Sequence, residues 1–323
     1  MAAAAKRIDI AVGYINPGAL ADISGFLHDY PKTELRMLVG MQYLEGFTQP
    51  QIDALEKLNE QLQGRMESSL LVSTRVKYHG KVYHFTEEDT SESAYIGSAN
   101  LAAIQDAYRS TFEAGVVITS EAYDIGEYLK SHVFPLGTEF DTLEIQATCT
   151  ETTPLENLVR DRLVEKIPEG EPKELTKYQP KFSYEIPLKD TPSSNLNCFF
   201  GKGREHKPTG KILRRPWYEV ELIPGVEITR QEGYPQNKAR FEVVTDDGYS
   251  FECNVNGQNG NKNFRSSESL SILGTFLKGR LEAQGVLKVG EPVTKEHLEK
   301  YGRSTVNLSY YEETGRWILD FRN

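Results

Sequence analysis

Tyr78-His79-Gly80-Lys81 and, after an acidic loop, Gly97-Ser98-Ala99-Asn100 are the two stretches that decide what this chain can be. Alternate side chains of an extended strand share a face, so His79 and Lys81 are predicted to point into one pocket. Imidazole, with an ordinary pKa of ~6.5, can act as nucleophile or acid without a metal ion. Lysine adds charge and asparagine adds neutral donors. This combination suits an anionic phosphodiester with a poor leaving group.

The sequence around these stretches alternates between strand-like and helix-like patterns. Strands are predicted at 8–12, 35–39, 70–78, 81–85, 94–97 and 112–119. Helical spacing of apolar residues predicts helices at 52–62 and 123–132. Residues 1–150 are therefore expected to form an α/β domain with a mixed sheet flanked by helices.

Proline- and glycine-rich interruptions between 151 and 193 predict a linker there, with a short helix near 158–165. Residues 194–323 are expected to form a mainly-β domain, a small barrel with one or two helices. Its strands are predicted at 218–223, 240–244, 249–254, 306–310 and 317–321. An apolar stripe at 270–281 predicts a helix capped by Ser266 or Ser267 and ended near Gly285.

Charge and cysteine content narrow the class of protein. The net charge is −10, and residues 1–150 carry all the excess, with 11 Lys and Arg against 21 Asp and Glu, while the remainder holds 26 of each. Three widely spaced cysteines disfavour disulfide frameworks and cysteine-rich zinc sites. No apolar run approaches the ~18 residues of a membrane span. We expect a cytoplasmic protein without a membrane partner.

The two opening stretches resemble the His-x-Lys and Gly-Ser-x-Asn signature of the phospholipase D superfamily, over most of residues 8–135. The resemblance implies that His79 is the nucleophile, through a phosphohistidine, or the acid. It also implies that Lys81 and Asn100 hold the phosphate, that Ser98 supports the pocket, and that Glu113 orients the histidine. No cofactor is implied.

Two details qualify this resemblance. Thr86 stands where the family pattern often has an aspartate, which disfavours the lipid-hydrolysing members. No other histidine is followed two residues later by lysine, so the chain holds half of a two-histidine site and is expected to form a homodimer through residues 1–150. His84 with Glu87, Glu88 and Asp89 offers an alternative, a metal site, although acidic runs in loops are more often merely solvated.

Two polar stretches of the second half are candidate DNA contacts. The first supplies Lys202, Arg204, Lys211, Arg214 and Arg215, and the second supplies Asn256, Gln258, Asn259, Asn261, Lys262, Asn263 and Arg265. Asparagine and glutamine pair with adenine, and arginine or lysine with guanine, in the major groove. Taken alone, either stretch also fits a solvated loop.

From Asn195 to the end, the chain resembles the NgoFVII-type restriction endonucleases, which are related to the BfiI type. The motifs that carry this are Gly201-Lys202-Gly203-Arg204, 215–220, the second polar stretch and 287–292. The resemblance implies a domain similar to the plant B3 fold whose two arms enter double-stranded DNA, and a companion methyltransferase that protects host DNA. The alternatives are a non-specific nuclease of the same superfamily and a DNA-binding protein with an inactive nuclease fold.

Overall fold

The computed structural model describes residues 5–101, 113–149, 158, 163–168, 170–207, 210–257 and 262–323. They divide into two compact units, one formed by the described residues up to 149 and the other by those from 158 onward. No helix among these residues is long and apolar enough to cross a membrane.

The first unit is built on a seven-stranded sheet with the order β6-β5-β4-β1-β2-β3-β7. The strands are β1 (Ala5–Val12), β2 (Glu34–Val39), β3 (Ser69–Ser73), β4 (Lys81–Glu87), β5 (Glu92–Gly97), β6 (Gly115–Ile118) and β7 (Gly137–Glu139). β1, β2 and β3 run parallel, whereas β4 pairs antiparallel with both β1 and β5. The sheet is therefore mixed, as expected.

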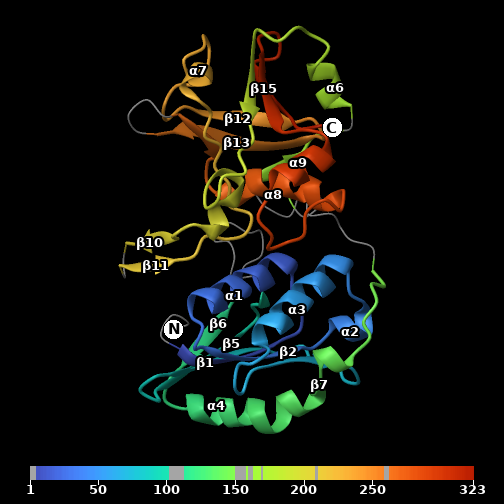
Figure 1. The fold of residues 1–323 in the computed structure, drawn as a ribbon, viewed down its shortest axis with the longest axis vertical. Coiled ribbons are helices and arrows are strands. Elements are labelled where there is room, and N and C mark those ends of the chain that lie inside the picture. The colour runs from blue at the N-terminus through green and yellow to red at the C-terminus, as the bar shows by residue number, and fades with distance from the viewer. Residues whose placement is uncertain are drawn as a thin grey trace. The chain divides into compact units, whose positions relative to one another are not determined.

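Helices cover both faces of this sheet (Figure 1). α1 (Pro17–Asp29) and α3 (Gln49–Leu62) lie on one face, and α4 (Ala122–Tyr128), continued by a π-helical turn over Leu129–Val133, lies on the other. The short α2 (Gln42–Glu45) follows β2. Apolar side chains of the strands alternate between the two resulting cores, so the sheet is buried on both faces.

Two elements of the first unit differ from expectation. The strand predicted at 70–78 ends at Ser73, because the residues that follow leave the sheet and approach β1 and β2 from their ends. α1 was not predicted, although Asn16 accepts a hydrogen bond from the Ala19 amide at 2.7 Å and Pro17 opens the helix. Both residues are ordinary signals of a helix start.

The second unit contains a larger β-structure and a separate hairpin. The sheet order is β14-β13-β12-β16-β15-β9, and β8 also pairs with β13. The strands are β8 (Val164–Lys166), β9 (Phe182–Pro187), β12 (Arg240–Thr245), β13 (Tyr249–Asn256), β14 (Asn263–Ser266), β15 (Thr305–Tyr311) and β16 (Arg316–Asp320). β10 (Arg204–His206) and β11 (Lys211–Leu213) form the hairpin.

Among the described residues of this unit, the α-helices are α6 (Glu171–Leu175), α7 (Val226–Thr229), α8 (Leu270–Ala283) and α9 (Lys295–Tyr301), and a 3-10 helix runs over Asn195–Phe200. α8 is the longest and lies beside α9 below β12 and β13 in Figure 1. The helix predicted at 270–281 is thus present, but its N-cap is Ser269 rather than Ser266 or Ser267. Ser266 is fully buried and donates its hydroxyl to the Ser269 carbonyl instead.

Two stretches of the second unit have a different structure from the one expected. Within 151–193, the expected linker, β9 pairs with β15 and β8 pairs with β13, because the proline- and glycine-rich breaks separate short strands. Of the short helix predicted near 158–165, Leu158 is helical, whereas Val164 and Glu165 belong to strand β8. The strand predicted at 218–223 is reduced to one bridge between Leu222 and Phe264.

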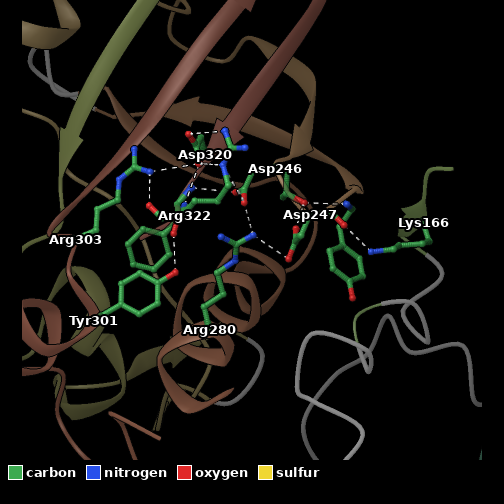
Figure 2. A network of polar contacts seen from close by, with 11 residues as sticks. Lys166, Asp246, Asp247, Arg280, Tyr301, Arg303, Asp320 and Arg322 are labelled. Atoms are coloured by element: carbon green, nitrogen blue, oxygen red, sulfur yellow. Dashed lines mark hydrogen bonds and ion pairs between the residues drawn. The ribbon is translucent and has the colours of Figure 1, made fainter. Parts of the chain in front are cut away.

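A buried polar network joins α8, β16 and the turn between β12 and β13 (Figure 2). Arg280, only 9% exposed, contacts Asp246 at 2.7 Å and Asp247 at 2.9 Å. Burial raises the pKa of Asp246 although Arg280 opposes the shift. Asp320, at the end of β16 and thus on the neighbour of β12 in the sheet, accepts from Arg322 Nε at 3.0 Å. The network ties the helix to the sheet on which the proposed DNA contacts are built.

Gly274 provides a test of how tightly α8 packs. A Cβ atom at this position would overlap the Tyr218 carbonyl oxygen and lie 3.1 Å from Val220 Cγ1. We expect Gly274→Ala to lower the free energy of unfolding by about 1–3 kcal/mol through overpacking, despite the better helix propensity of alanine. Chemical denaturation measures this, with Thr275→Ala on the same helix as the control. Equal stability of the two variants would contradict the close approach.

Candidate active site and DNA-reading surface

The candidate catalytic residues converge because β4 lies antiparallel between β1 and β5. Lys81, at the start of β4, is the register partner of Val12 at the end of β1. Val82 is the partner of Ile96, one residue before β5 ends. The chain leaving β1, the chain entering β4 and the chain leaving β5 therefore meet at one edge of the sheet.

His79 lies just before β4 and is exposed. Its ring packs edge-on against Tyr14, with the centroids 5.6 Å apart. Gly13 lies beneath it, and a Cβ there would come within 2.9 Å of His79 Cδ2. The imidazole is thus accessible while its ring is held between the end of β1 and the start of β4.

Lys81 and Asn100 contact the backbones of His79 and Tyr14, the two residues whose rings pack together. Lys81 is only 8% exposed and its Nζ donates to the His79 carbonyl at 2.8 Å. Burial lowers the pKa of Lys81, and the charge of Glu113 partly opposes this. Asn100 Oδ1 accepts from the Tyr14 amide at 3.1 Å, so its Nδ2 remains as the donating end of the side chain. An ammonium group and an amide donor therefore lie at the same end of the sheet as the imidazole.

Ser98, directly after β5, contacts Glu113, which lies shortly before β6 begins. The Ser98 hydroxyl donates to the Glu113 carboxylate and accepts from the Ala114 amide at 3.0 Å. The sequence analysis expected Glu113 to contact His79. Among the described residues, Glu113 instead accepts a hydrogen bond from Ser98. In this arrangement Glu113 fixes the loop that carries Asn100.

The sequence analysis missed three residues near the site, which are Tyr14, Glu45 and Lys77. The Tyr14 hydroxyl donates to Glu45 at 2.6 Å, and Lys77 Nζ contacts the same carboxylate at 3.0 Å. The pKa of Glu45 lies below its usual value because of the Tyr14 and Lys77 contacts, with a smaller contribution from His79. The position of Tyr14 directly after the first strand was the available signal. Glu45 carried no local signal.

His84 belongs to a buried polar cluster on the other face of the sheet. Its Nδ1 lies 3.5 Å from Asp9 and its Nε2 lies 3.4 Å from Glu92, so its neighbours are not Glu87, Glu88 and Asp89. Arg36 donates to both Asp9 oxygens, at 2.7 and 2.9 Å. Within the described ranges, no three His, Cys, Asp or Glu side chains are grouped as metal ligands.

The first group of candidate DNA contacts lies on and around the β10–β11 hairpin. Lys202 is exposed, and Arg204 is 59% exposed with Nη2 3.2 Å from Glu219. Arg215 is only 20% exposed and its Nε lies 2.6 Å from the same carboxylate. Arg214 lies over the Phe199 ring, 4.4 Å from its centroid. The backbone of Lys211 is in β11, and its side chain lies outside the described part.

The second group lies on β13, β14 and the residues between them. Asn256 and Asn263 are register partners, as are Asn254 and Arg265. Strand alternation places these four on the face opposite buried Val255 and Phe264. Lys262 donates to the Thr229 carbonyl at 3.1 Å. Gln258, Asn259 and Asn261 lie outside the described residues.

Comparison with protein families identifies both units. Residues 1–134 match the NgoFVII restriction endonuclease N-terminal PLD domain, and residues 174–312 match the NgoFVII C-terminal B3-like DNA-binding domain. A search of curated proteins found no match. The chain is thus a nuclease that joins a phospholipase-D-type catalytic domain to a B3-like DNA-binding domain. It belongs to the NgoFVII family of restriction endonucleases.

The Asp9 cluster provides a prediction about stability beneath the site. Burial alone raises the pKa of Asp9, but the neighbouring His84 ring and the hydrogen bonds from Arg36 outweigh it, and the pKa lies below its usual value. The ionised carboxylate therefore stabilises the fold above pH ~4, and this contribution is lost as pH falls through the lower folded-state pKa.

We expect Asp9→Asn to cost about 3 kcal/mol at pH 7, since it leaves Arg36 without its charged partner. The variant should also lose less stability than the parent between pH 4 and pH 2. Urea unfolding at a series of pH values measures both effects, and Glu88→Gln, an exposed carboxylate in the turn after β4, is the control. Parallel pH profiles for Asp9→Asn and the parent would contradict this account.

Proposed function

We propose that this chain is a sequence-specific endonuclease that hydrolyses double-stranded DNA through His79 without a metal ion. The observation that carries the proposal is the convergence of His79, Lys81 and Asn100 at one sheet edge. Together they offer a nucleophile or acid, a positive charge and a neutral donor to one phosphate.

In the proposed reaction an imidazole nitrogen of one His79 forms a bond to phosphorus while the phosphorus–oxygen ester bond breaks. A second imidazole gives its proton to the leaving oxygen. Water, losing a proton to that second imidazole, then attacks phosphorus and releases the first histidine. Lys81 and Asn100 hold the phosphoryl oxygens throughout. Ser98 and Glu113 keep the Asn100 loop in place.

The second imidazole is proposed to come from another copy of the chain. His79 is the one histidine of the sequence that is followed two residues later by lysine. A two-fold axis through the first unit would bring two copies of His79 to a single phosphate. The active form is then a homodimer formed through residues 1–150, with one composite centre.

The second unit is proposed to read the DNA sequence with two arms. The first arm is the β10–β11 hairpin with its flanking residues 202–215, and the second arm is the β13–β14 hairpin from Asn254 to Arg265. A nuclease directed at specific sites endangers its own cell, so we also propose a companion DNA methyltransferase. Both act in the cytoplasm, where the three free cysteines remain reduced.

The histidine mechanism predicts cleavage of plasmid DNA in excess EDTA, with discrete fragments. His79→Ala is expected to lower the cleavage rate on the order of 10³-fold or more while DNA binding persists, since the nucleophile is lost and the second unit is intact. Agarose gels and a binding assay measure the two properties, and exposed His28→Ala is the control. A strict requirement for a divalent ion would exclude this mechanism, and a smear of products would indicate a non-specific nuclease.

The reading arms predict different effects for different contacts. Replacing Arg204 or Arg265 by alanine should cost about 1–3 kcal/mol in binding to the recognition sequence if each contacts a guanine edge. Binding to unrelated DNA should change little. Competition binding measures the difference, with Arg316→Ala as a control, because Arg316 is also paired with a glutamate, at 2.8 Å from Glu171. Equal weakening on all sequences would indicate phosphate contacts instead.

A further inference from the structure

Two glutamates close together in the sequence each hold an arginine of a different arm. Glu219 accepts from Arg204 Nη2 with both oxygens, at 3.2 and 3.3 Å, and Arg204 belongs to the first arm. Glu221 accepts from Arg265 Nη1 at 3.1 Å, and Arg265 belongs to the second arm. Both carboxylates emerge from residues 217–222, which we name the bridge segment.

The bridge segment is fixed to the core of its unit. Trp217 is fully buried, and Lys278 of α8 donates to its carbonyl at 2.6 Å. The Tyr218 hydroxyl donates to Glu282, also of α8, at 2.8 Å. At the other end, Leu222 and Phe264 exchange two backbone hydrogen bonds of 2.9 Å. The two carboxylates therefore project from a rigid base.

The bridge to β14 also explains the position of Glu221. Because Leu222 pairs antiparallel with Phe264, the preceding Glu221 lies beside Arg265, which follows Phe264. Arg265 also donates its Nε to Asn254 Oδ1 at 3.2 Å, so two of its nitrogens are held. A guanidinium restrained in this way has lost much of its rotamer freedom before DNA arrives.

Glu219 is held from a second side by Arg215, whose Nε lies 2.6 Å from Oε2. Glu219 and Arg215 are both largely buried, whereas Arg204 is 59% exposed. An ion pair with so exposed a partner contributes little to stability. The contact occupies one nitrogen of Arg204, and its Nε and Nη1 have no protein partner in the described part of the chain. The effect that remains is the orientation of a largely exposed arginine side chain.

We propose that Glu219 and Glu221 are positioning residues that set sequence discrimination by orienting Arg204 and Arg265 toward base edges. An oriented guanidinium matches the paired acceptors of guanine, whereas a mobile one binds any phosphate within reach. This inference rests on the proposed reading function of the two arms.

The test uses the full chain carrying His79→Ala, so that DNA is bound but not cut. Its probes are a duplex with the recognition sequence, obtained by sequencing fragment ends from the active protein, and a scrambled duplex of equal length and composition. Glu219→Gln and Glu221→Gln are each expected to reduce the ratio of the two affinities about tenfold. The affinity for the scrambled duplex should stay constant or rise.

Glu205→Gln is the matched control because Glu205 is an exposed glutamate on the same hairpin and has no arginine contact among the described residues. It removes the same charge and should leave the ratio unchanged. For Glu219→Gln and Glu221→Gln, the slope of affinity for the scrambled duplex against salt concentration should stay constant or steepen, since a released arginine can gain a phosphate contact. Glu219→Asp, which keeps the charge, is expected to restore part of the discrimination.

Arg204→Ala and Arg265→Ala in the same assay distinguish failure of the proposed reading function of the arms from failure of the positioning role of the glutamates. If they leave the ratio unchanged, the arms do not read DNA and the proposed function itself fails. If they reduce the ratio while both glutamine variants keep it, the positioning role alone is overturned. Should Glu219→Gln fail to fold because Arg215 loses its partner, Glu221→Gln decides the outcome, and an unchanged ratio there refutes the inference.

Discussion

The antiparallel register of β4 between β1 and β5 is the constraint on which the candidate active site depends. It sets Lys81 opposite Val12 and brings the residues after Ile96 to the same edge. Side chains of a strand alternate between faces, so a slip of one residue would turn Lys81 away from Asn100 and place His84 in the opposite core. The buried Asp9 cluster opposes such a slip because it links β1, β2 and β4 through Arg36 and His84.

Both units place exposed candidate functional side chains on buried supports. In the first unit, exposed His79 lies on the backbone of Gly13, and its carbonyl oxygen accepts a hydrogen bond from Lys81. In the second unit, exposed Arg204 rests on Glu219, and the bridge segment is held by Lys278 and Glu282 of α8. Functional groups positioned in this way meet a ligand with less loss of rotamer entropy.

Periodicity in the sequence was enough to predict the central elements of the first sheet and the α3 and α8 helices. Asn100 was assigned to the site through the resemblance to the phospholipase D signature, whereas periodicity placed only His79 and Lys81 on one face. Periodicity could not find Glu45, which reaches the site through a tertiary contact with Tyr14. The β9 strand was hidden among proline-rich breaks, since its partner β15 is more than a hundred residues away.

Composition identified the two proposed arms, but it did not indicate how exposed each arginine is or which side chain it is paired with. Arg204 and Arg215 look equivalent in the sequence, yet one is mostly exposed and the other is largely buried against Glu219. The difference arises from the turn at Pro216 and from the packing of Trp217, which are properties of the folded unit. Local sequence fixes the type of side chain available for DNA, while tertiary structure fixes its orientation.

The uneven charge of the chain fits this arrangement. The first 150 residues have ten more acidic than basic residues, so DNA is repelled from most of that unit at distances within a Debye length, ~8–10 Å. The second unit is balanced overall, and each arm carries an arginine paired with a glutamate of the bridge segment. Non-specific attraction is therefore weak in both parts of the chain. Under the proposed function, stable engagement would then depend on contacts that only the correct sequence completes, which would restrict cleavage to sites that the second unit has recognised.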